Sequence, residues 1–159
     1  MKTPHVWPDL AGRIENGAHV MAVRVYYEDT DFSGVVYHAS YLRFMERGRT
    51  DFLRLLGTDA RGMIDGSDSR EPAAFVVRRM VCDFVRPARM DDLLEVETRV
   101  KEIGGASVTL LQIITLQGRR IFEAEVTVVL VSLSGKPLRL SGAVRGAFEG
   151  HLAETSSGA

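Results

Sequence analysis

The sequence has little of several features that mark specialised classes of protein. Its 159 residues include one cysteine, Cys82, so no disulfide can form within the chain, which suits a reducing cytoplasm. Twenty basic and 21 acidic residues leave a net charge of −1, which gives no sign of a nucleic-acid or membrane-surface partner. No apolar run approaches the roughly 20 residues that span a bilayer, and the first residues lack the apolar segment of a secretory signal. We therefore expect a cytoplasmic globular protein without a membrane span.

The motifs of several enzyme classes are also missing. The sequence contains no Gly-x-Ser-x-Gly elbow and no phosphate-binding loop. No cluster of histidines, cysteines and carboxylates has the spacing of metal ligands, so neither a metal nor a cofactor is expected. Cys82 has no basic partner nearby in the sequence, which argues against a catalytic thiol.

The first half of the chain predicts a strand followed by a long helix. Residues 19–28 are rich in valine and tyrosine, which favours a strand, and the polar residues before Gly34 end it. One apolar face at helical spacing then predicts a helix of about 17 residues that stops at Gly57; its members are Tyr41, Phe44, Met45, Gly48, Phe52, Leu55 and Leu56.

Four strand-like runs follow, over residues 74–85, 92–102, 106–117 and 121–133. The second alternates apolar and charged residues with a period of two, and Gly104-Gly105 predicts a hairpin after it. Ser141 is a candidate cap for a short helix. The predicted fold is α+β, with a five-stranded antiparallel sheet wrapped around one long central helix.

Residues 1–159 are expected to form one domain. Residues 1–18 form a loosely attached N-terminal arm in this interpretation, and residues 150–159 a flexible tail. A single sheet with one helix leaves edges open, which favours a homodimer or a homotetramer that joins sheets.

The turn from Glu28 to Asp31 is the candidate site. A carboxylate just ahead of a helix start stays ionised, as a nucleophile or base requires, and the unpaired N–H groups of the helix can hold a carbonyl oxygen. The competing interpretation makes Asp31 a turn or capping residue only. Glu28 belongs to the strand alternation, and Asp29 is expected to face solvent or bind turn amides.

His38 lies at the expected start of the helix. It could donate a hydrogen bond to substrate, orient a water or present its backbone N–H; the alternative is a histidine bonded to a neighbouring carbonyl. Tyr27 and Tyr37 could line a pocket, although aromatics at such places more often belong to the core. Arg86 and Arg89 are either surface charge or contacts to an anionic ligand.

The run RVYYEDTDFSGVVYHASYLRFMERGRTDFL closely resembles the signature of the 4-hydroxybenzoyl-CoA thioesterase family, in particular its YbgC-like acyl-CoA thioesterases. FVRPARMDDLLEVET and IFEAEVTVVLVSL extend the resemblance over about residues 20–148. The resemblance implies a hotdog fold, an acyl-CoA substrate and hydrolysis of its thioester at sites between paired subunits.

By position, the resemblance places the catalytic aspartate at Asp31 and the residue whose N–H polarises the carbonyl at His38. Substrate-binding residues are then expected at Tyr27, Val36, Tyr37, Arg86 and Arg89. Some relatives carry basic residues for the CoA phosphates at the hairpin where this chain has Gly104, Gly105 and Ala106. The phosphates would need other partners here, or the acyl carrier would be an acyl-carrier protein.

Two other functions are compatible with the same fold, because fold alone does not fix function. One is an acyl-CoA hydratase or dehydratase that uses an acid–histidine pair. The other is a non-catalytic protein that binds acyl-CoA or an acyl-carrier protein, which the intact EDTD turn argues against.

Overall fold

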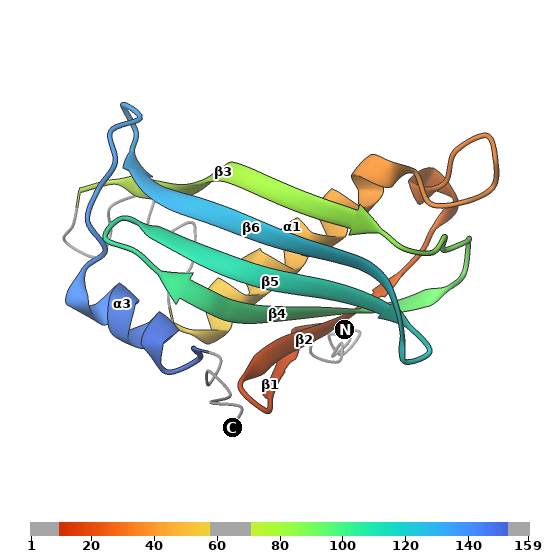
Figure 1. Cartoon of the computed structure of the whole chain (residues 1–159), viewed down its shortest axis with the longest axis horizontal. Helices are drawn as coiled ribbons and strands as arrows, with labels where there is room; N and C mark the ends of the chain where they lie inside the picture. Colours follow the sequence, from red (N-terminus) through yellow and green to blue (C-terminus); the bar gives the residue numbers. More distant parts are fainter. Residues whose placement is uncertain (1–9, 58–70, 153–159) are drawn as a thin grey trace, which may run out of the picture.

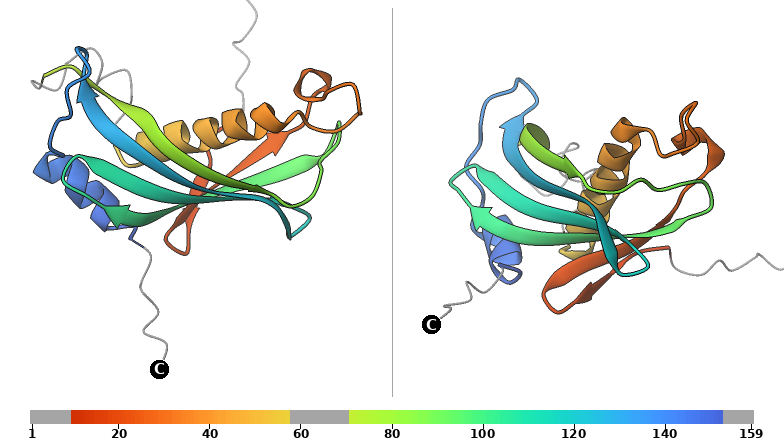
Figure 2. Two further views of the ribbon diagram at one scale, coloured as in Figure 1. Left: turned by 45° about the horizontal axis from the view of Figure 1, so that its top comes forward. Right: turned by 45° about the vertical axis from the view of Figure 1, so that its right-hand side comes forward.

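The computed structural model describes residues 10–57 and 71–152, where an antiparallel sheet curves around one long helix (Figure 1 and Figure 2). In chain order the elements are β1 (Arg13–Glu15), β2 (Ala18–Arg24), a 3-10 turn η1 (Tyr27–Asp29), α1 (His38–Leu55), β3 (Ala73–Phe84), β4 (Leu93–Ile103), β5 (Ser107–Leu116), β6 (Arg119–Ser132) and α3 (Gly142–Glu149). The strand order across the sheet is β1-β2-β4-β5-β6-β3. The predicted α+β layout is confirmed, and it is the hotdog arrangement.

The sheet has six strands, so the prediction of five was wrong by one. The extra strand, β1, pairs with β2 and lies within the predicted N-terminal arm. Asn16 and Gly17 join the two strands with φ of 50° and 76°, the paired positive values of the tightest hairpin turns. An Asn-Gly pair is a strong hairpin signal, which the interpretation as an arm overlooked. Residues 1–9 of that arm lie outside the described residues.

The first predicted strand is shorter than expected. β2 ends at Arg24, and Tyr27 to Asp29 form the 3-10 turn instead. The Asp29 carboxylate accepts a hydrogen bond of 2.9 Å from the N–H of Tyr26. A side chain that captures a nearby backbone donor competes with strand pairing, so the polar turn begins earlier than the run of valines and tyrosines indicates.

The helix lies on the concave side of the sheet and buries the face that its spacing predicts. Tyr41, Phe44, Met45, Gly48 and Phe52 are all buried. They pack against inward-facing sheet residues, including Leu94, Val96, Val100, Ile114, Phe122 and Val126. Gly57 follows the helix with a φ of 84°, as expected of a glycine that ends a helix.

Gly48 lets α1 approach the sheet closely. A Cβ at this position would lie 3.1 Å from a Val96 methyl carbon and 3.3 Å from the Thr98 hydroxyl. Gly48→Val should therefore lower the free energy of unfolding by about 1–3 kcal/mol through overpacking. Urea denaturation at fixed protein concentration measures this loss. Arg43→Val, on the exposed side of the same helix, is the control and should change stability by less than the Gly48 variant.

The short second helix is confirmed. Ser141 caps α3, and its hydroxyl oxygen accepts a hydrogen bond of 3.3 Å from the N–H of Val144. In Figure 1, α3 lies at the end of the sheet formed by the β4–β5 hairpin. Within residues 10–57 and 71–152, no helix is both long and apolar enough to cross a membrane.

Candidate active site

The acidic turn is a compact backbone loop that leads into α1. The N–H of Asp31 donates to the carbonyl of Val35, and the N–H of Gly34 donates to the carbonyl of Asp31, each at 3.0 Å. Gly34 has a φ of 82°, a conformation that a residue with a side chain adopts at a cost. The turn therefore fixes the backbone of Asp31 relative to the residues just before the helix.

The Asp31 side chain is exposed and is held on one side by Ser33. Its Oδ1 accepts hydrogen bonds from the Ser33 hydroxyl at 2.5 Å and from the Ser33 N–H at 2.8 Å. These two donors, the hydroxyl first, lower the pKa of Asp31 below its ordinary value, with a smaller contribution from the nearby His38 ring. Oδ2 accepts neither of these two hydrogen bonds. The carboxylate is thus ionised, oriented and accessible at one oxygen.

The start of α1 offers backbone donors beside this turn. Tyr37 is the N-cap residue, and no side chain caps the helix. The N–H of Tyr37 donates to the carbonyl of Asp29 at 2.8 Å, which ties the helix start to the acidic turn. In the described part of the chain, the N–H groups of His38 and Ala39 have no backbone or side-chain acceptor. Such uncapped amides, at the positive end of the helix dipole, bind an anionic oxygen.

His38 is the first residue of α1, as predicted. Its exposed ring lies 4.4 Å from the Tyr37 ring and 6.3 Å, edge-on, from that of Phe84 at the end of β3, measured between centroids. The contact with Phe84 places the helix start at the end of the β3 edge strand. His38 and the half-exposed Tyr37 therefore lie at the end of β3 and directly follow the Asp31 turn.

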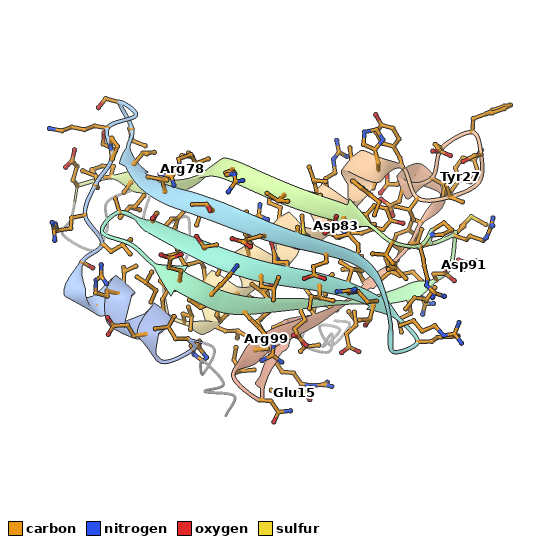
Figure 3. All side chains as sticks on the ribbon, viewed as in Figure 1. Glu15, Tyr27, Arg78, Asp83, Asp91 and Arg99 are labelled. Atoms are coloured by element: carbon orange, nitrogen blue, oxygen red, sulfur yellow. The ribbon has the colours of Figure 1, made fainter. Side chains whose placement is uncertain are left out.

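The structure separates the remaining predicted site residues. Val36 is buried in the core and its N–H donates to the carbonyl of Ala88, and its expected role in binding substrate stays a prediction. Tyr27 is exposed at the outer end of the loop, away from the sheet (Figure 3). Arg89 pairs with Val35 through a backbone bridge and so lies against the Asp31 turn. Arg86 instead joins the cleft beside the β5–β6 turn.

Ser33 is a residue of the candidate site that the sequence analysis did not identify. Its hydroxyl and N–H both bind Asp31, and together they set the carboxylate's orientation and charge. The signal was present in the chain, because an aspartate two residues before a serine is a frequent turn motif in which the side chain binds that backbone. Asp31 is therefore a turn residue as well as an exposed carboxylate, so the two interpretations of it are compatible.

The arrangement places an ionised carboxylate in the turn that leads into a helix start with free N–H groups. A carbonyl whose oxygen binds those amides gains stabilisation as negative charge develops on that oxygen. The carboxylate can then attack the carbonyl carbon or remove a proton from water. The described residues contain no group of three or more histidines, cysteines and carboxylates placed to hold a metal ion.

Comparison with known proteins gives a consistent picture. Residues 33–123 match the model of the thioesterase superfamily. The chain is 43% identical over 129 residues to the acyl-CoA thioester hydrolase YbgC of Escherichia coli, an alignment that covers 80% of this chain and 92% of that protein. It is 42% identical to the acyl-CoA thioesterase YbgC of Haemophilus influenzae, over 82% of this chain and 93% of that one. The crystal structure of a probable thioesterase from Bartonella henselae is 44% identical, with a TM-score of 0.75, over 78% of this chain and 99% of that one.

Proposed function

The chain belongs to the thioesterase superfamily, with the YbgC-like acyl-CoA thioesterases as relatives over most of its length, and on this premise we propose that it hydrolyses acyl-CoA with Asp31 as the nucleophile or general base. It is a thioester hydrolase. The observation that supports the assignment of Asp31 is its ionised carboxylate, held by Ser33 beside the uncapped start of α1. Among the acids of its turn, Glu28 is an exposed residue of η1, and Asp29 accepts a hydrogen bond from Tyr26.

In this mechanism the thioester carbonyl oxygen binds the N–H groups of His38 and Ala39. The free Oδ2 of Asp31 attacks the carbonyl carbon, the carbon–sulfur bond breaks, and the CoA thiolate leaves and takes up a proton. Water then hydrolyses the mixed anhydride to the free acid and restores the carboxylate. In the alternative, Asp31 takes a proton from the water that attacks. Each donor aimed at the developing oxyanion is worth about 10²–10³-fold in rate.

Ser33 gives this proposal a pH signature. The group that reacts is the ionised Asp31, and the Ser33 hydroxyl is the main cause of its lowered pKa. Ser33→Ala removes this donor, so the pKa of Asp31 should rise and the acid limb of kcat/KM should move to higher pH. The value of kcat/KM on the plateau at higher pH should change little. A pH profile of thiol release checks this, and a limb that moves to lower pH would contradict it.

We also place the site in a homodimer or a homotetramer that assembles through the β3 edge. β3 ends the sheet and exposes apolar side chains at Val76, Val77, Val81 and Phe84. A long apolar edge strand invites pairing with another chain. Because Phe84 contacts His38, a partner strand at this edge would lie beside the start of α1. Sedimentation equilibrium measures the assembly directly.

A thiol-release assay across short-chain, long-chain and aromatic acyl-CoA thioesters tests the proposed reaction. Release of CoA in equal amount to free acid supports it. Hydration of an enoyl-CoA without release of thiol would instead identify a hydratase. Tight binding of acyl-CoA with no turnover at any chain length would identify a binding protein. Acyl-carrier-protein thioesters in the same assay identify the preferred carrier, and the proposed cellular location is the cytoplasm.

A further inference from the structure

A cavity lies away from the Asp31 turn, between the later half of α1 and strands β3, β5 and β6. Its volume is about 400 Å³, within the range of small-molecule sites. Most of its wall is apolar, contributed by Phe52, Leu53, Ala74, Phe75, Val76, Val77, Leu110, Val128 and Phe148. Among the described residues, Glu46, Arg49 and Thr50 bring polar side chains to it. The lining therefore suits an apolar molecule that carries one polar group.

Arg49 is the distinctive member of this wall. Its side chain is half-buried, and its NH1 group donates a hydrogen bond of 2.9 Å to Oε1 of Gln112. Gln112 is itself fully buried and donates to the Thr98 hydroxyl at 2.9 Å and to the Met45 carbonyl at 3.0 Å. One nitrogen of the guanidinium thus binds a buried core residue, which fixes the position of the group.

The rest of the Arg49 guanidinium has no acceptor among the residues that the structure describes. Within residues 10–57 and 71–152, it forms no ion pair with a carboxylate and no hydrogen bond other than that to Gln112. Burial lowers the pKa of Arg49, while the charge of Glu46 acts in the opposite direction. A guanidinium carries five N–H donors, and leaving donors unpaired in a desolvated place is costly.

Glu46 lies one helical turn earlier and is exposed on the same wall. It is not within ion-pair distance of Arg49, although the two are three residues apart. The described chain therefore leaves the cation of Arg49 available to a ligand, and Glu46 would repel an anion there.

We propose that this cavity binds a chain of apolar carbons that ends in a carboxylate, with the carboxylate on Arg49. The planar fork of a guanidinium matches the two oxygens of a carboxylate, and the apolar wall accommodates the chain. The choice of ligand rests on the proposed function, because a thioesterase that acts on acyl-CoA releases a free acid of this kind. The carboxylate could come from that free acid or from the far end of an acyl group.

Calorimetric titration of the whole protein with octanoate and with 1-octanol tests the charge requirement without any turnover. Octanoate should bind, and 1-octanol should bind about tenfold or more weakly. Arg49→Gln should weaken octanoate binding by about 10–100-fold, the range expected for a lost charged hydrogen bond. Glu46→Gln should strengthen it, because it removes the repelling charge. Arg47→Gln, an exposed arginine on the same helix, is the control and should leave the affinity unchanged.

Equal affinities for octanoate and 1-octanol, or no binding of octanoate, would overturn the proposal. If Arg49→Gln does not fold, Ala74→Phe offers an independent test, because it fills the cavity from β3 and should abolish binding. Retained binding in that variant would count against the site.

Octanoate that competes with acyl-CoA in the thiol-release assay identifies the cavity as part of the acyl site; binding without competition identifies a separate site for the acid. Both results support the carboxylate site, and a protein that binds octanoate but releases no thiol refutes only the proposed reaction.

Discussion

Asp31→Asn is expected to slow thiol release from acyl-CoA by about 10²–10⁴-fold, the range for removal of a positioned acid–base group. Asparagine keeps the shape of the side chain, and its carbonyl oxygen can still accept the two hydrogen bonds that Ser33 donates to Asp31. It can neither attack a thioester nor take up a proton at neutral pH. The turn should therefore keep its conformation while the chemistry is lost. Measured kcat/KM and a thermal unfolding curve separate these two effects.

Glu28→Gln is the matched control for this variant. Glu28 lies in the same turn and is exposed, so its replacement removes one negative charge near the site without touching Asp31 or Ser33. Its activity should stay within a few fold of the native protein. Full activity of Asp31→Asn, or an equal loss in both variants, would contradict the assignment. In the native protein, a burst of about one thiol per site would identify attack by the carboxylate itself.

The order and faces of the main elements could be predicted because they follow from local patterns. Alternation along β4 indicates which residues face inward, and Leu94, Val96, Thr98 and Val100 are all fully buried. The helical spacing from Tyr41 identifies the buried face of α1 in the same way. The nearly continuous apolar run of the last strand indicates either the interior of the sheet or a buried subunit contact, and β6 lies in the interior, between β5 and β3.

The polar contacts between distant parts of the chain could not be predicted in this way. Asp51 lies off the apolar face of the helix and is nevertheless buried, and an aspartate is rarely buried without a partner. The partner is His19, 32 residues earlier on β2, and no local pattern joins the two. The link between Arg49 and Gln112 spans 63 residues and escaped prediction for the same reason. The contribution of Ser33 to the site, by contrast, is local and was readable from its spacing to Asp31.

Asp51→Ala is expected to lower the free energy of unfolding by about 3 kcal/mol or more, because it leaves the donors of His19 and Gly12 without their acceptor, each at a cost of about 1–3 kcal/mol. The Oδ2 atom of Asp51 lies 2.6 Å from Nε2 of the fully buried His19. It also accepts a hydrogen bond of 2.7 Å from the N–H of Gly12, and Oδ1 binds Arg54. One carboxylate thus joins the helix to β2 and to the segment before β1. Urea denaturation at fixed protein concentration measures the loss.

The contrast with an exposed pair shows why burial decides the size of this effect. Glu15→Ala breaks the contact with Arg13 at the surface of β1, and exposed pairs contribute about 0–1 kcal/mol. An equal loss in both variants would refute the special role of Asp51.

The pH dependence gives a second test of Asp51. Burial alone would raise its pKa, but the hydrogen bonds from His19, Arg54 and Gly12 outweigh burial and hold the pKa below the ordinary value of 3.8. A carboxyl group with a depressed pKa stabilises the fold above its unfolded-state pKa and loses that contribution as pH falls through the folded-state value. As the pH falls below about 5, the native protein should therefore lose more stability than Asp51→Ala. The free energies of unfolding of the two proteins should converge in acid. Because the same carboxylate accepts the N–H of Gly12, the convergence should coincide with a lower protection factor of the Gly12 amide against hydrogen exchange.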